Sequence, residues 1–121
     1  MDKADKLLPS KESVRKRIYA YELGLDGHLG LLKIGQTVKD VPVRVKQQLQ
    51  TANIKNYKIV LDESAEKLDG SLMSDFDVRK RLQEKGFESA NGEWMKVSAE
   101  DVRKCIQELR DGIDYEGSHH L

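Results

Sequence analysis

Two tyrosines and several clustered cations in the first half of the chain are of the types that could act on a polyanion. Tyr19 and Tyr21 are separated by one residue, so alternation along a strand would place both side chains on the same face. Basic residues concentrate at 11–17 and 33–46, whereas much of the acid falls at 62–77 and after 111. Because the 21 basic and 21 acidic residues cancel, a polyanion would have to be held by local clustering of charge.

The basic stretch ahead of the tyrosines is the first candidate for such a contact. In the simpler interpretation it is a solvated arm, but beside a strand it could grip a DNA backbone without sequence preference. DNA is therefore the predicted partner. The predicted DNA-binding residues are Lys11, Arg15, Lys16, Arg17 and Lys46.

The tyrosines must be positioned by a β-hairpin. Residues 17–23 are rich in strand formers, and residues 24–30 supply three glycines and an Asp-Gly pair typical of a hairpin loop. Residues 31–37 are then the returning strand. His28 in the loop is expected to be solvated.

A capped helix is predicted after the hairpin. Asp40 is the expected N-cap, and Pro42 suits the first turn. The four-residue spacing of Val41, Val45 and Leu49 gives this helix its core face. Arg44 and Gln48 share a neighbouring face.

The second half repeats the capping signal. Residues 57–62 read as a third strand. Ser74 with Asp77, and Ser98 with Asp101, have the spacing of a capping box and open two more helices. Residues 93–97 between these helices read as a short strand, in which Trp94 is expected to belong to the core.

The predicted architecture is a small α+β domain with the order β-β-α-β-α-β-α and a three-stranded antiparallel sheet flanked by helices. A chain of 121 residues suits one core. We expect a basic N-terminal arm at 1–16, the domain at 17–110 and a disordered tail at 111–121. No apolar run spans a membrane, and the single Cys105 suits a reducing compartment, so the predicted location is the cytoplasm without membrane association.

Short strings along these elements resemble the GIY-YIG nuclease superfamily. Arg17-Ile18-Tyr19 matches its first strand, residues 33–37 (KIGQT) match its second, and Arg44 matches its helical arginine. Residues 92–95 (GEWM) resemble the Gly-Glu-Trp-Phe string of the phage-type branch. The resemblance implies the N-terminal module of a larger restriction or helicase-like protein, whose attached helicase or DNA-targeting domains would select the substrate.

The resemblance also implies metal-dependent hydrolysis of DNA phosphodiester bonds. Tyr19 would activate water, and Arg44 would hold the scissile phosphate through its planar fork of donors. Mg²⁺ or Mn²⁺ would stabilise the leaving oxygen. Tyr21 and Gly35 would shape the site, with Gly35 letting the backbone approach it.

Two residues depart from the family's pattern. Lys33 stands where the family has its second tyrosine; it could bring positive charge to the phosphate or lower the pKa of a neighbouring phenol. Gln48 stands where the family often has His or Tyr, and an amide is a poor proton carrier.

The metal ligand is the least determined part of the predicted site. The resemblance puts Asp75 where the family has a glutamate, although Asp75 and Asp77 are also simply favourable charges at a helix N-terminus. The alternative ligands are Asp77, Glu66, Asp69 and Glu93.

Three functions therefore stay open at this stage. The first is a DNA endonuclease. The second is a catalytically degenerate relative that binds nucleic acid, which the Lys33 and Gln48 departures favour. The third is a protein-interaction domain, which the zero net charge favours.

Overall fold

A computed structural model describes residues 15–113 of the chain. Most of the predicted arm, including Lys11, and the predicted tail from residue 114 onward lie outside the described residues.

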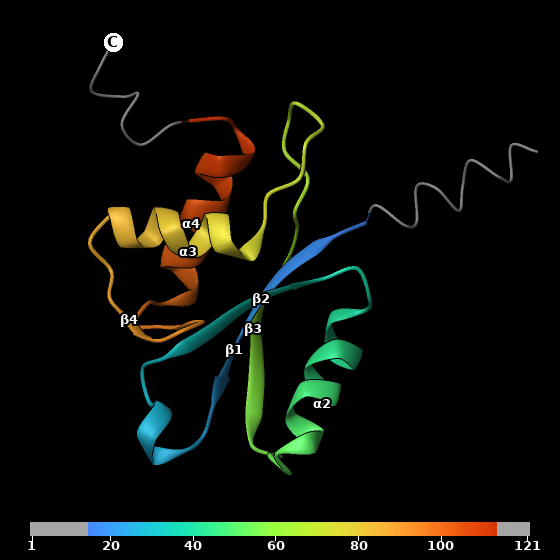
Figure 1. The fold of residues 1–121 in the computed structure, drawn as a ribbon, viewed down its shortest axis with the longest axis vertical. Coiled ribbons are helices and arrows are strands. Elements are labelled where there is room, and N and C mark those ends of the chain that lie inside the picture. Colours follow the sequence, from blue (N-terminus) through green and yellow to red (C-terminus); the bar gives the residue numbers. More distant parts are fainter. Residues whose placement is uncertain (1–14, 114–121) are drawn as a thin grey trace, which may run out of the picture.

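A five-stranded antiparallel sheet in the order β3-β1-β2-β5-β4 forms the centre of the fold (Figure 1). The predicted hairpin is present as β1 (Arg17–Leu23) and β2 (Leu32–Thr37), joined by a loop that contains a short 3-10 turn, Asp26–His28. β3 (Tyr57–Ser64) pairs with the other edge of β1. The central strand β1 is therefore hydrogen-bonded on both sides.

The α+β class is as predicted, but the three-stranded sheet is wrong. Where the sequence predicted one strand at 93–97, the structure has a small hairpin of β4 (Ser89–Asn91) and β5 (Trp94–Met95). Gly92 makes the turn with a φ of 58°, a conformation that glycine adopts without a steric penalty. β5 then pairs with the start of β2 and extends the sheet.

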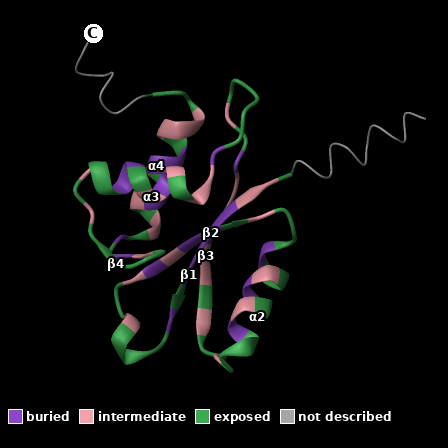
Figure 2. Cartoon of the chain, viewed as in Figure 1, coloured by how far each residue is buried: buried purple, intermediate pink, exposed green. Residues whose placement is uncertain are grey.

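Helices cover both faces of the sheet, and each face has its own apolar cluster (Figures 1 and 2). α2 (Val41–Thr51) covers one face, and α3 (Asp75–Glu84) with α4 (Ala99–Arg110) covers the other. The cluster under α2 consists of Tyr19, Tyr21, Leu23, Val41, Val45 and Leu49. The larger cluster under α3 and α4 includes Ile18, Ile34, Leu61, Met73, Val78, Leu82, Met95, Val102 and Ile106.

The predicted helix starts are correct, but only two of them are capped by a side chain. Ser74 with Asp77 and Ser98 with Asp101 form complete capping boxes. Asp40 stands at the N-cap of α2, yet its side chain makes no capping hydrogen bond. No helix among residues 15–113 is long and apolar enough to cross a bilayer.

Candidate functional site

Two stacked tyrosines lie at the centre of the sheet face that α2 covers. Tyr19 and Tyr21 are both 1% exposed, and their nearly parallel rings (7°) have centroids 6.2 Å apart. Alternation along β1 brings both onto this face. Trp94 of β5 meets Tyr21 edge-on at 5.8 Å, and His28 from the hairpin loop meets Trp94 at 4.9 Å. The pair thus continues into an aromatic row across the sheet.

Gly35 allows the Tyr19 ring to lie against the backbone of β2. The two residues are cross-strand partners. A Cβ atom built on Gly35 would lie 2.5 Å from the Tyr19 hydroxyl oxygen and 2.6 Å from its Cζ. No side chain fits there without displacing the ring, which gives the predicted close approach at Gly35 a specific cause.

α2 brings Arg44 and Gln48 over the two phenols. The residues are one helical turn apart and half-buried. The Tyr21 hydroxyl donates a hydrogen bond to Gln48 Oε1 at 3.2 Å. Burial raises the pKa of Tyr19, and hydrogen bonds with Gln48 and Arg44 lower it by less. α2 thus places Gln48 in hydrogen-bonding contact with Tyr21, and both Gln48 and Arg44 favour a lower pKa of Tyr19.

Both tyrosines are held in the protonated form. The pKa of Tyr21 is raised to about 12, chiefly by burial and to a smaller extent by the neighbouring Tyr19 and Glu93. Any activation of water by Tyr19 would therefore use the neutral hydroxyl, because a buried phenolate is costly. The arrangement suits a hydroxyl that donates a hydrogen bond.

Lys33 and Glu93 form an ion pair at the margin of the tyrosine pair. Lys33 Nζ lies 3.2 Å from Glu93 Oε1 and 5.9 Å from the centroid of the Tyr21 ring. The negative charge of Glu93 also favours a higher pKa for both tyrosines. Of the predicted metal-ligand candidates, Glu93 is the one that adjoins this cluster.

The other predicted carboxylates have partners of their own. Asp77 accepts the backbone N–H of Ser74 in the α3 capping box. Asp75 Oδ2 lies 3.3 Å from Arg79 Nη1, and its backbone N–H donates to the Gln36 side chain at 2.8 Å. This bond sets the first turn of α3 against the end of β2. Glu66 and Asp69 lie exposed in the loop between β3 and α3.

Among the described residues, no group of three or more His, Cys, Asp or Glu side chains is placed to hold a metal ion. A Mg²⁺ ion bound together with substrate needs less, since one or two carboxylates and the substrate's phosphate oxygens are enough. Glu93, with Asp75 as the alternative, is compatible with that kind of binding.

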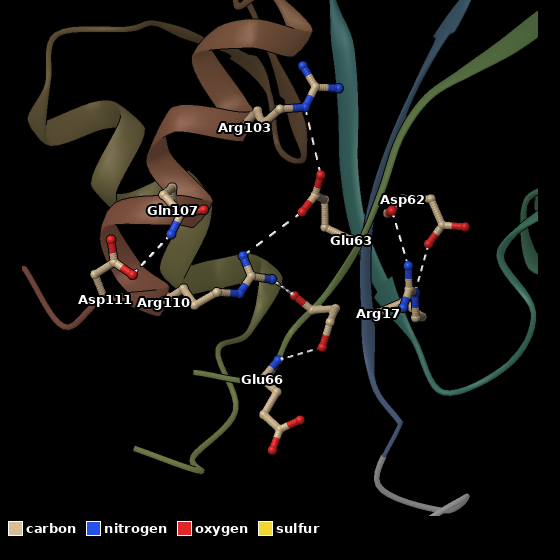
Figure 3. Close-up of polar contacts among 9 residues, drawn as sticks. Arg17, Asp62, Glu63, Glu66, Arg103, Gln107, Arg110 and Asp111 are labelled. Atoms are coloured by element: carbon tan, nitrogen blue, oxygen red, sulfur yellow. Dashed lines mark hydrogen bonds and ion pairs between the residues drawn. The ribbon is translucent and has the colours of Figure 1, made fainter. Parts of the chain in front are cut away.

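The described members of the predicted DNA-binding set lie in two places: Arg15, Lys16 and Arg17 together line one cavity, and Lys46 lines another on α2. Arg17 Nε pairs with Asp62 Oδ1 at 2.8 Å on β3 (Figure 3). Arg15 and Arg17 line a cavity of about 470 Å³ at the start of α2, together with Lys39, Asp40 and Asp62. Lys46 is exposed on α2 and does not line that cavity. Lys16 contributes its backbone oxygen, which accepts the N–H of Ala65.

Three contacts of the site were not predicted from the sequence. Arg79 joins α3 to the sheet by donating to the Ile34 carbonyl oxygen at 3.0 Å. The Lys33–Glu93 pair depends on the β2–β5 pairing, and the His28–Trp94 contact depends on how the hairpin loop folds back. The Gly92 turn signal was the only local hint, because it separates β4 from β5.

Comparison with known proteins places this arrangement in a family. The T5orf172 domain matches residues 17–110, from the first residue of β1 to the last residue of α4. The chain belongs to the T5orf172 domain family. No curated protein and no solved structure matches the chain.

Membership of the T5orf172 domain family overturns the resemblance to the GIY-YIG nuclease superfamily, because the family that matches is a different one. The strings that carried the resemblance have structural reasons to recur. Ile18 and Ile34 are core residues, and Gly35 accommodates the ring of its cross-strand partner Tyr19.

Proposed function

We propose that the α2 face of the sheet binds a nucleic-acid phosphodiester and hydrolyses it with a divalent cation, Mg²⁺ or Mn²⁺. The observation that carries the proposal is the convergence of two tyrosine hydroxyls with Arg44, Gln48 and Lys33 on one face. A phosphodiester is anionic, and its hydrolysis needs cations and hydrogen-bond donors around the developing charge.

Binding of the phosphate is assigned to the half-buried cations. Arg44 offers a planar fork of donors that matches two phosphate oxygens. Lys33 adds a second positive charge from β2, with its Nζ 5.9 Å from the centroid of the Tyr21 ring. The phosphate would then bind to Arg44 and Lys33, and the nearly buried tyrosine hydroxyls would donate hydrogen bonds to it from the sheet.

Hydrolysis forms a bond from a water oxygen to phosphorus and breaks the bond from phosphorus to a sugar oxygen. The water must lose a proton, and the departing oxygen must gain one. A neutral Tyr19 hydroxyl can accept the water's proton while donating its own to a non-bridging phosphate oxygen. No phenolate then forms, which agrees with the raised pKa of Tyr19. The departing oxygen takes its proton from solvent.

A divalent cation at this site would neutralise charge that develops on the phosphate and on the departing oxygen. Glu93 is the preferred protein ligand, since its carboxylate adjoins the cluster and is 46% exposed. Binding a cation there would release Lys33 from its ion pair toward the phosphate. Asp75 is the alternative ligand.

The proposal is tested by nicking of supercoiled plasmid over a Mg²⁺ titration. Arg44→Ala should lower the nicking rate by about 10²–10³-fold, and Tyr19→Phe should abolish turnover with DNA binding retained. Arg103→Ala is the matched control, because Arg103 is an exposed arginine that pairs with Glu63 and Glu100 on the opposite face. If Arg44→Ala and Tyr19→Phe nick like the parent, the proposal is wrong.

The same assay separates the candidate ligands. The variant that removes the ligand, Glu93→Gln or Asp75→Asn, should require far more Mg²⁺ for the same rate. Asp77→Asn should mainly lower helix stability, because Asp77 completes a capping box.

A second candidate function is nucleic-acid binding without hydrolysis. Gln48 favours it, since an amide is a poor proton carrier. A parent chain that binds DNA but never nicks it at any Mg²⁺ concentration would establish this function instead.

A further inference from the structure

A second cavity lies on α2, away from Arg44 and Gln48. It has a volume of about 390 Å³, within the usual range of small-ligand pockets. The cavity lies where α2 ends and β3 begins. Its lining residues are Lys46, Gln50, Asn53, Ile54, Lys55 and Tyr57.

The floor of the cavity is apolar and fixed. Ile54 and Tyr57 are half-buried and pack against the cluster that includes Val45 and Leu49. The backbone N–H of Ile54 donates to the Leu49 carbonyl at 3.0 Å. Asn53 has a φ of 57°, which turns the chain sharply after the helix. The Tyr57 ring is therefore presented by a backbone held in place by the core.

The rim of the cavity is positively charged. Lys46 and Lys55 are both exposed, and within residues 15–113 no carboxylate lines this cavity. The cavity beside Arg15 and Arg17 differs, because Asp40 and Asp62 line it as well. An anion is therefore favoured more clearly at the lysine rim.

Gln50 and Asn53, both exposed, complete the lining with their side-chain amides. Each amide can both donate and accept hydrogen bonds, as the edges of nucleobases do. An aromatic ring on an apolar floor, paired amides and two cations together match a planar base that carries a phosphate. A fatty or purely anionic ligand would use only part of this lining.

We infer that this cavity binds one nucleotide, with the base against Tyr57 and Ile54 and the phosphate between Lys46 and Lys55. Lys46 lies two positions from Arg44, about 200° around the helix, so α2 separates the cavity from the candidate site. The inference rests on the proposed function only in naming a nucleic-acid strand as one source of the nucleotide; a free nucleotide is the other.

The test is a titration of the ¹⁵N-labelled chain with adenosine 5′-monophosphate, followed by backbone amide shifts. Saturable shifts should centre on residues 50–57, with a dissociation constant at least tenfold lower than that of inorganic phosphate. Lys46→Gln with Lys55→Gln should weaken binding tenfold or more. Lys58→Gln is the matched control, because Lys58 is an exposed lysine nearby that does not line the cavity.

The contribution of the base is tested separately with Tyr57→Leu, which keeps an apolar side chain in the cluster. This variant should bind adenosine monophosphate about tenfold more weakly while its affinity for inorganic phosphate stays the same. If a single-stranded oligonucleotide competes with adenosine monophosphate, the bound nucleotide belongs to a nucleic-acid strand. If it does not compete, the ligand is a free nucleotide.

Absence of saturable shifts, equal affinity for inorganic phosphate, or equal loss in Lys58→Gln would each overturn the inference. Arg44→Ala distinguishes it from the proposed function. That variant should lose nicking and keep the shifts at residues 50–57, so a failure of either proposal is visible without the other.

Discussion

The two faces of the sheet are built in different ways. Under α3 and α4 the buried cluster is almost wholly aliphatic, and the buried Arg81 beside it pairs with Glu108 at 2.8 Å. Under α2 two stacked tyrosines occupy the centre, and their hydroxyls meet polar side chains of the helix. The face under α3 and α4 therefore buries mainly apolar side chains, and few of its polar groups need hydrogen-bond partners. The face under α2 buries polar hydroxyl groups at its centre, which an ordinary apolar core lacks.

The difference indicates a division of labour. A buried hydroxyl must be hydrogen-bonded, so the α2 face gains less stability from the same area than an aliphatic cluster does. We expect substitutions under α3 and α4 to act mainly on stability. Substitutions under α2 should act mainly on the site.

The largest stability effect is expected for Leu82→Ala. Leu82 is completely buried between α3 and the sheet, and its truncation should lower the free energy of unfolding by about 2–5 kcal/mol. Urea unfolding gives the value. Leu68→Ala, at a side chain 76% exposed, should change it by less than about 0.5 kcal/mol. A small loss at Leu82 would contradict the stability assigned to this face.

Gly35→Ala should affect both properties. The added methyl would overlap the Tyr19 ring, so we expect a loss of about 1–3 kcal/mol and a displaced hydroxyl. Gly27→Ala is the control, because its Cβ would meet nothing within 4 Å. Thermal unfolding measures the loss, and the plasmid assay measures the site. Unchanged stability in Gly35→Ala would show that the ring moves freely.

Tyr21→Phe should cost about 1 kcal/mol, since it removes the hydrogen bond to Gln48. It should also change the alkaline limb of stability. The pKa of Tyr21 is raised to about 12 in the folded chain, so the unfolded chain loses this proton first as pH rises above about 10. The stability that the parent loses between pH 10 and 12 should shrink in Tyr21→Phe. If stability falls equally with pH in the parent and in Tyr21→Phe, the pKa of Tyr21 is not raised in the folded chain.

The smallest contrast concerns the helix caps. Ser98→Ala in α4 should lower stability by about 1 kcal/mol, because Ser98 accepts the N–H of Asp101. Asp40→Ala in α2 should cost much less, because the Asp40 side chain makes no capping bond. Chemical denaturation of Ser98→Ala and Asp40→Ala measures the two losses of unfolding free energy. Equal losses would show that the caps of α4 and α2 contribute equally, against this prediction.

Local signals were enough to predict the three long strands and the three helices, but they did not predict β4 or the non-local strand pairings. Alternation around Tyr19 and Tyr21 and the spacing from Ser98 to Asp101 are readable within a few residues. The pairing of β5 with β2 is not, because β5 is only two residues long and its partner is far away in the sequence. The Lys33–Glu93 ion pair depends on that pairing.

The family resemblance failed for a related reason. Ile18 and Ile34 belong to the core, and Gly35 leaves room for the Tyr19 ring, so both short strings have packing reasons that do not depend on ancestry. Short matching strings of this kind reflect packing requirements and are weak evidence of common ancestry. The match over residues 17–110 uses the whole domain instead.

The register shift between Ala20 and Tyr21 has a consequence for solubility. Ala20 pairs with Leu61 and Tyr21 with Ile59, so β3 carries one extra residue, Val60, at this point. β3 is an eight-residue strand at the sheet edge, and a regular edge of that length is a template on which other chains can polymerise. A bulge bends and twists the strand, which interrupts the even spacing that an incoming strand needs. The irregularity thus guards the domain against edge-to-edge aggregation.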